Sequence, residues 1–403
     1  MKLFFGALID KYSKTPGPRN EVDRITTVGL LYQRIFGQQV LDSKWTWKKY
    51  FVHQLIILAV FVYVFFGTLE RIRSTDDVDL VAEACYTFVM IIMFSLKMLL
   101  FINNRFTFRE LYVTAKTKLF AVIQADSSAQ VDNALKTGKR IVYLLISMVL
   151  IPCFIFELMV LWNYINGKRI LLSRGTVTLM PMSSPYFEIA WFIHSICLFQ
   201  ISTTIILDMW FVLLVYLLCC ASDSLAKILL VQPKGKTESR LSYSNRLNSS
   251  LRTFYKIHTD HVHATYFNFF RYTKALSNMY KWLAFVPLCN AAMCVCIILL
   301  LMSKEINWKF APNLMPMFAE IFVYNWFGEK IKNKADDLYN NVINFDWTNL
   351  KLKDKKNYYI ITKYMNKEVG IKTAIGYDLS LITMTAVLKV SYQTFTVLQS
   401  MDK

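Results

Sequence analysis

The stretch IAWFIHSICLFQISTTIILDMWFVLLVYLLCCA, residues 189–221, contains a single charged residue, Asp208. A helix rises about 1.5 Å per residue, so about 20 apolar residues cross the roughly 30 Å hydrocarbon core of a bilayer. The stretch is clearly longer than that. It therefore predicts a membrane-spanning helix that tilts or continues past the bilayer.

Four more apolar runs predict further spans, at residues 51–69, 84–102, 141–162 and 282–302. Two weaker runs, 310–327 and 374–398, contain proline, charged and hydroxyl residues. Polar groups at membrane depth are tolerated where they face protein or a water-filled cavity. The sequence therefore predicts an all-α membrane protein of seven helices, in which the two polar spans belong to the functional interior.

The composition favours one membrane domain surrounded by lipid. The chain has 403 residues, of which 55% are hydrophobic, and no Pro/Gly/Ser-rich linker divides it. Its net charge is +18, but the basic residues lie between the apolar runs, so we expect no nucleic-acid partner. The eight cysteines lie in or beside apolar runs without a CxxC spacing, which predicts packed thiols and neither a disulfide framework nor a zinc site.

The distribution of basic residues predicts the orientation. Of the 46 Lys and Arg residues, 36 fall in one alternate set of segments and 8 in the other. Because cytoplasmic loops carry the excess of Lys and Arg, the N-terminus should be cytoplasmic and the C-terminus extracellular. This orientation is the reverse of a G-protein-coupled receptor. The basic set of segments is 1–49, 103–140, 221–281 and 328–372.

Motifs for catalysis and cofactor binding are absent from the sequence. It contains no G-x-S-x-G, H-E-x-x-H, Walker A or G-x-G-x-x-G element, so we expect neither an enzyme nor a cofactor. His258, Asp260, His261 and His263 cluster in sequence, but only His258 and His261 share a helix face, which favours a solvated helix over a metal site. A secondary transporter would show internal repeats, and none is visible.

Two segments near the C-terminus resemble the insect odorant receptor family. Residues 379–398, LSLITMTAVLKVSYQTFTVL, resemble the last helix of that family, with Met384 in place of a usual Phe. Residues 324–329, YNWFGE, resemble its Y-C-x-x-G element, with Asn325 where Cys is common. The related insect gustatory receptors have a different last-helix ending, in which Gln-Phe follows the Thr-Tyr pair. A gustatory-type channel and, more remotely, a G-protein-coupled receptor are the alternatives.

The resemblance implies a tetrameric, odorant-gated, non-selective cation channel in the plasma membrane of a sensory neuron dendrite. It implies a tuning subunit that binds a small volatile odorant and assembles with a co-receptor into a heterotetramer. The chain lacks the long second inner loop of that co-receptor. The implied organisation is a cytoplasmic N-terminal segment (1–49), spans 1 to 4 with an outer-half ligand pocket (50–221), a cytoplasmic helical loop (222–281), spans 5 and 6 (282–327), a cytoplasmic anchor segment (328–373) and a pore-lining span 7 (374–403).

The implied ligand pocket lies in the outer half of spans 2, 3, 4 and 6. An odorant pocket is apolar and aromatic with few polar groups. Transfer by membrane depth then gives the expected contacts. They are Tyr86, Met90, Phe154, Leu158, Phe192, Phe199, Phe318 and Phe322.

The implied pore wall is one face of the last span. Thr394, Val397 and Met401 are spaced i, i+3 and i+7, with Val397 as a hydrophobic constriction and Ser400 and Met401 at the outer mouth. The alternative is that this stripe packs against neighbouring helices.

Charged residues within spans are costly in lipid. Counting from the outer ends places Lys97 and Asp208 at similar depth, which predicts a structural salt bridge between spans 2 and 4. Glu157 and Glu320 lie nearer the outer ends of their spans, where they either orient a polar ligand or reach water, and we expect the second.

Overall fold

The computed structural model describes residues 15–16, 20–38, 40–42, 45–46, 48, 51–126, 128–171, 179–232, 238–259, 268–304 and 311–401. In this part of the chain the regular elements are all helical, apart from an isolated bridge between Lys372 and Asp378. The predicted all-α fold is confirmed. The segment 260–267 lies outside the described residues, so the structure does not report on the histidine cluster.

Two short N-terminal helices, α2 and α3, precede the long ones. The elements before α10 are α2 (Glu21–Ile25), α3 (Thr27–Ile35), α4 (Phe51–Ser74), α5 (Val78–Asn103), α6 (Arg105–Thr114), the π-helix η1 (Ala115–Leu119), α7 (Phe120–Gln124), α8 (Ser128–Ile165) and α9 (Tyr186–Ile201). The remaining elements are α10 (Thr203–Leu229), α11 (Arg240–Thr259), α12 (Phe269–Lys304), α13 (Ala311–Ile343), α14 (Leu352–Met365) and α15 (Leu381–Met401).

Five helical stretches of the described chain are long and apolar enough to cross a membrane. They match the five clear apolar runs of the sequence. They are Phe51–Ser74, Leu80–Asn103, Ala129–Ile165, Tyr186–Leu229 and Phe269–Leu299. The weaker run 310–327 falls in the first half of α13, and of the run 374–398 only residues 381–398 are helical, in α15.

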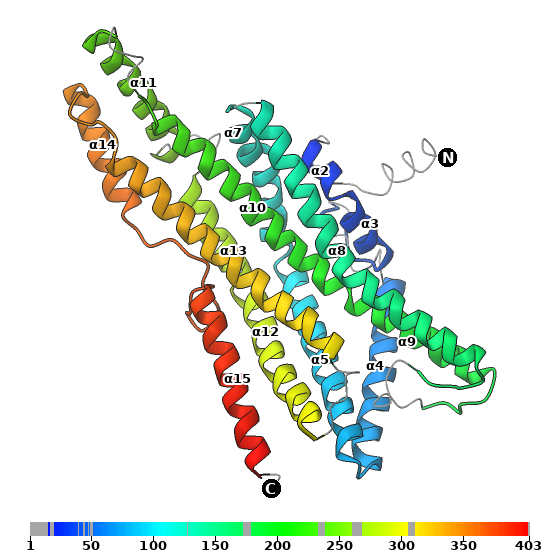
Figure 1. Cartoon of the computed structure of the whole chain (residues 1–403). Helices are drawn as coiled ribbons and strands as arrows, with labels where there is room; N and C mark the ends of the chain where they lie inside the picture. Colours follow the sequence, from blue (N-terminus) through cyan, green and yellow to red (C-terminus); the bar gives the residue numbers. More distant parts are fainter. Residues whose placement is uncertain are drawn as a thin grey trace.

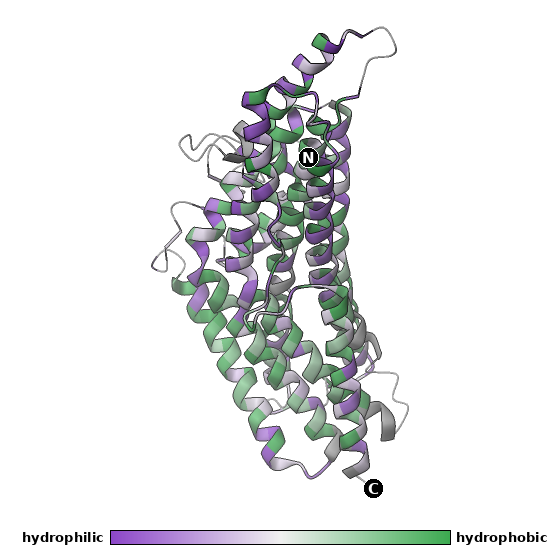
Figure 2. Cartoon of the chain, turned by 90° about the vertical axis from the view of Figure 1, so that its left-hand side faces the viewer, coloured by the Kyte–Doolittle hydropathy of each residue, from purple (hydrophilic) through white to green (hydrophobic). Residues whose placement is uncertain are grey.

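The molecule is elongated and has a polar and an apolar zone. In Figure 1, α11 and α14 lie at the upper end and α15 reaches the lower end, while Figure 2 shows the lower part mostly hydrophobic and the upper part more hydrophilic. Helix α8 has 38 residues, so it is about 57 Å long and exceeds the membrane core. Such helices pass from the apolar zone into the polar zone without a break.

Helix α10 is the central packing element. In the stretch that contains it, 94% of the most apolar window is buried, compared with 22% for the stretch that contains α8. Helix α10 packs against α8 and α13, and α12 packs against α5 and α15. At the polar end of the α10–α13 contact, Lys334 lies 2.7 Å from Asp223, and this hydrogen bond raises the pKa of Lys334. Helix α8 leaves large apolar side chains exposed, as expected of a surface that meets lipid.

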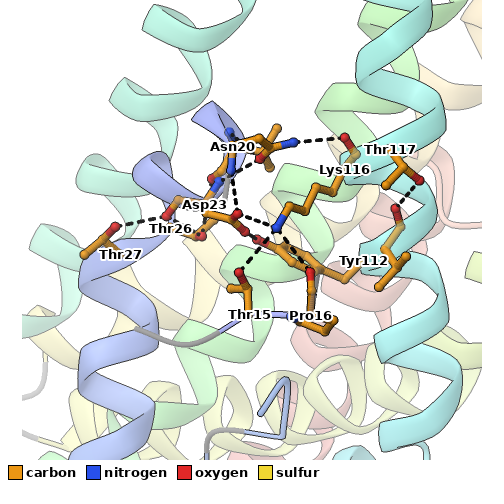
Figure 3. Close-up of polar contacts among 11 residues, drawn as sticks. Thr15, Pro16, Asn20, Asp23, Thr26, Thr27, Tyr112, Lys116 and Thr117 are labelled. Atoms are coloured by element: carbon orange, nitrogen blue, oxygen red, sulfur yellow. Dashed lines mark hydrogen bonds and ion pairs between the residues drawn. The ribbon is translucent and has the colours of Figure 1, made fainter. Parts of the chain in front are cut away.

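The N-terminal helices are fixed to the bundle by a buried polar cluster (Figure 3). Asn20 caps α2 through the amides of Val22 and Asp23, and its side-chain amide donates to the carbonyl oxygen of Lys116 in the π-helix at 3.0 Å. The Lys116 ammonium lies 2.5 Å from the Asp23 carboxylate, and Tyr112 donates to the same carboxylate. Segments that are far apart in the chain are thus held together by a paired buried charge.

Candidate functional site

Three charged side chains from three helices meet inside the apolar zone. The ammonium of Lys97 on α5 lies 2.5 Å from one oxygen of Asp208 on α10 and 2.7 Å from the other. It also lies 2.8 Å from Oε1 of Glu320 on α13. We call these three residues the charged cluster. Because each charge is costly to bury alone, the cluster holds α5, α10 and α13 at one fixed relative position.

Tyr324 extends the charged cluster along α13. Its hydroxyl donates a short hydrogen bond to Oδ1 of Asp208, and its ring is fully buried. The ring stacks on Phe211 of α10 with centroids 4.8 Å apart. Both oxygens of Asp208 therefore have partners, one in α5 and one in α13.

A cleft opens beside the charged cluster between α8, α10 and α13. Its volume, including the open mouth, is about 420 Å³. We call it the α8–α13 cleft. Its lining is Leu145, Met148 and Val149 of α8, Asp208 of α10, and Ala319, Glu320 and Val323 of α13. One wall is entirely apolar and the other carries two carboxylates, a combination that suits a small apolar ligand with one oriented polar group.

A smaller cleft shares Val149 with the first. Its volume, including open solvent at its mouth, is about 210 Å³, and it is lined by Tyr32, Ile146, Val149, Leu150, Ser202 and Ile206. The Tyr32 hydroxyl donates to the carbonyl oxygen of Phe199 at 2.7 Å and contacts the Ser202 hydroxyl. This second cleft offers no charged group.

One turn of α13 connects the charged cluster to the start of α15. Asn325 follows Tyr324, and its side-chain oxygen accepts a hydrogen bond from the backbone amide of Ser380 at 3.1 Å. The Ser380 hydroxyl in turn accepts from the amide of Thr383, which caps the first turn of α15. We call Asn325, Gly328, Leu379 and Ser380 the α13–α15 junction. A methyl group on Gly328 would lie 2.3 Å from the carbonyl oxygen of Leu379, so only glycine permits this approach.

Helix α15 has two unlike faces. Ser391 is buried, and the Cys296 thiol of α12 donates to its carbonyl oxygen at 3.2 Å. The opposite face leaves polar and small apolar side chains exposed in the isolated chain. These are Thr385, Lys389, Val390, Gln393, Thr394, Val397 and Ser400, and Ile382, Ala386, Tyr392, Thr396 and Gln399 of α15 are exposed as well.

Comparisons with known proteins identify this arrangement of helices. The profile of the family described as 7tm Odorant receptor matches residues 77–392. The chain belongs to the odorant receptor family. That assignment makes it a receptor channel and not an enzyme, and it decides against the gustatory and G-protein-coupled alternatives. No curated protein sequence matches the chain.

The receptor shares its fold with a solved insect receptor. It is similar to the olfactory receptor OR5 from Machilis hrabei, with a TM-score of 0.69 and 12% identity over 94% of this chain and 97% of that one. The same olfactory receptor in complex with eugenol gives a TM-score of 0.72 at 12% identity, over 94% and 98% of the two chains. At this identity the similarity establishes the seven-helix fold.

The receptor does not bring the eight expected ligand residues together around a described cavity. Phe154, Leu158 and Phe192 are 55%, 62% and 67% exposed on the outer surface of the single chain. Tyr86 and Met90 are partly buried against the hydrophobic core, and Met90 contacts the Asn290 side chain of α12. Phe199 packs its ring against Phe154, while Phe318 and Phe322 are partly exposed. The outer-half pocket stays a prediction.

The receptor brings Lys97 and Asp208 together and adds a third member. Glu320 bonds Lys97 through Oε1, and 17% of its side chain is exposed at the cleft, so its contact with water stays a prediction. The expectation for Glu157 is wrong: Oε2 accepts from the Trp191 indole at 2.8 Å and Oε1 is buried. The sequence analysis paired Lys97 with Asp208 and did not predict that Glu320 joins them.

Proposed function

We propose that this receptor is the tuning subunit of an odorant-gated cation channel and that it binds a small volatile ligand in the α8–α13 cleft. The observation that supports it most is the position of that cleft. The cleft is lined by α8, α10 and α13, which correspond to three of the four spans predicted to form the pocket. Its α8 residues, Leu145, Met148 and Val149, precede Phe154 and Leu158 in the chain. The solved relative that holds eugenol gives a precedent for a small volatile ligand in this fold.

The proposed ion path runs along the exposed face of α15. Four such chains, including co-receptor subunits, would place Thr394, Val397 and Ser400 around a common axis, with Met401 at the outer end. The side chain of Met401 lies outside the described residues. Hydroxyl groups that bond their own helix, as Thr394 does to the Val390 carbonyl oxygen at 2.9 Å, keep an acceptor free for a passing cation. Val397 would close the pore by dewetting.

The proposed coupling between ligand and pore runs through α13. A ligand that displaces Glu320 or Asp208 would move Tyr324, and Asn325 would carry that movement to the first turn of α15. We also propose that the receptor lies in the plasma membrane and that three of its segments face the cytoplasm. These segments are residues 1–49, 222–281 and 328–373.

The test is current recording from cells that express the receptor with the co-receptor, across a panel of volatiles. Ala319→Trp should fill the α8–α13 cleft and raise the half-maximal concentration of the best agonist at least tenfold. Leu144→Trp is the matched control, since Leu144 lies beside Leu145 but is exposed to the outside. If Leu158→Ala shifts the response and Ala319→Trp does not, the outer-half pocket is correct and the α8–α13 cleft is wrong.

The coupling step has its own test. Asn325→Ala should remove the acceptor for the Ser380 amide and lower the maximal current while agonist binding to purified receptor stays within threefold. Asn349→Ala, in the polar zone, is the control. Unchanged maximal current in a well-expressed Asn325→Ala receptor would contradict the coupling.

A further inference from the structure

The charged cluster contains one more negative charge than positive charge. Lys97 supplies the one cation, and Asp208 and Glu320 supply two carboxylates. Asp208 is fully engaged, because Lys97 and Tyr324 bond its two oxygens. Glu320 uses Oε1 for Lys97, and in the part of the chain that the structure describes it makes no other hydrogen bond. One carboxylate oxygen is thus left over at the wall of the α8–α13 cleft.

The helices around Glu320 offer no second cation. Helix α8 contributes Leu145, Met148 and Val149 to the cleft, all apolar. The other titratable groups near the charged cluster are Tyr280 and Cys294 of α12 and Tyr324 of α13. None of them carries a positive charge. Among the described residues, nothing can neutralise Glu320 from the cleft side.

From this geometry we infer that the ligand of the α8–α13 cleft is a small apolar amine, whose protonated nitrogen donates to the free oxygen of Glu320. The inference rests on the proposed function and names its ligand class. An ammonium group would balance the charged cluster, and its apolar body would cover the α8 wall. Charge-assisted hydrogen bonds of this kind are worth about 10- to 100-fold in affinity in a desolvated site.

The experiment compares matched pairs of ligands. Butylamine, hexylamine and 2-phenylethylamine are each paired with the alcohol of the same skeleton and applied at pH 7.4 to cells that express the receptor and the co-receptor. We expect the best amine to have a half-maximal concentration at least tenfold below that of its alcohol. Glu320→Gln should raise the value for the amine at least tenfold more than it raises the value for the alcohol of the same skeleton.

The control variant is Glu188→Gln, which makes the same change at an acid that bonds Tyr164 on the surface. It should leave all six responses unchanged. An alcohol as potent as its amine in the wild type, or an unchanged amine response in Glu320→Gln, would overturn the amine inference while the proposed function stands.

A binding measurement separates the two failures. Thermal unfolding of purified full-length receptor is recorded with each amine and each alcohol. If an amine stabilises the wild type but not Glu320→Gln, the amine inference is supported. If no current accompanies this stabilisation, only the proposal that the receptor is an odorant-gated channel is contradicted. If neither current nor stabilisation responds to any amine, the inference is wrong.

Discussion

Lys97 shows how a single residue organises the apolar zone. A lysine at the centre of a spanning helix costs about 2.5–3.5 kcal/mol on insertion, so it needs a partner. Here it has two, one on α10 and one on α13. The pairing with Asp208 follows from equal depth along the sequence. The contact with Glu320 does not, because it depends on how α13 is rotated about its axis.

Lys97→Met should destabilise the receptor by about 3–5 kcal/mol, because it leaves two buried carboxylates without a cation. Adding Asp208→Asn and Glu320→Gln to Lys97→Met should restore most of that loss, since the triple variant has no buried charge. The measurement is the thermal unfolding temperature of purified protein in detergent. If the triple variant is as unstable as Lys97→Met, unpaired buried charge is not the cause of the lost stability.

Asp23 has the same role at the other end of the molecule. Asp23→Asn should leave the buried ammonium of Lys116 unpaired and cost about 3–5 kcal/mol. Glu21→Gln, the same change two residues earlier at an exposed position, should stay within about 0.5 kcal/mol of the wild type. Thermal unfolding checks both variants, and equal effects would contradict the anchoring of α2.

At the scale of elements, the α13–α15 junction explains why certain motif residues are needed. The resemblance to the family was recognised from residues 324–329 and 379–398, and these two segments touch in the structure. Tyr324 faces the charged cluster, Asn325 bonds the start of α15, and Gly328 admits the Leu379 backbone. Sequence reasoning identified the motif, but not that its two halves form one contact.

Gly328→Ala should displace the start of α15, because the new methyl group would meet a backbone oxygen that cannot turn away. We expect odorant-evoked current to fall at least tenfold at normal surface expression. Gly138→Ala is the control, since its methyl group would make only ordinary contacts of 3.6–3.7 Å, with Tyr216 and Leu213 of α10 and Ile25 of α2. Normal current in Gly328→Ala would mean that the junction is looser than the structure shows.

The fold was predictable from the sequence more fully than the site was. Length and hydropathy identify the five clear spans, and the motif identifies the two polar ones. The pocket residues could not be placed, because a helix that is apolar on all sides carries no signal of which face turns inward. Phe154 and Leu158 lie four residues apart on one face of α8, and that face turns outward. Leu145, Met148 and Val149, which line the cleft, look no different in sequence.

For the whole molecule, the account depends on the exposed face of α15. That face carries the hydroxyl and amide groups of the last span, and Figure 1 places α15 at one side of the bundle, where other chains can reach it. A lipid-facing helix would not carry so many polar groups. The channel proposal, its tetrameric form and the role of Val397 all depend on water reaching this face.

The most direct measurement is chemical modification of single cysteines introduced into α15. A positively charged, membrane-impermeant thiosulfonate is applied from outside to Val397→Cys, to Ser391→Cys on the packed face, and to the wild type. We predict that it blocks odorant-evoked current in Val397→Cys and leaves the other two unchanged. Block in Ser391→Cys, with Val397→Cys unaffected, would contradict an ion path along this face of α15.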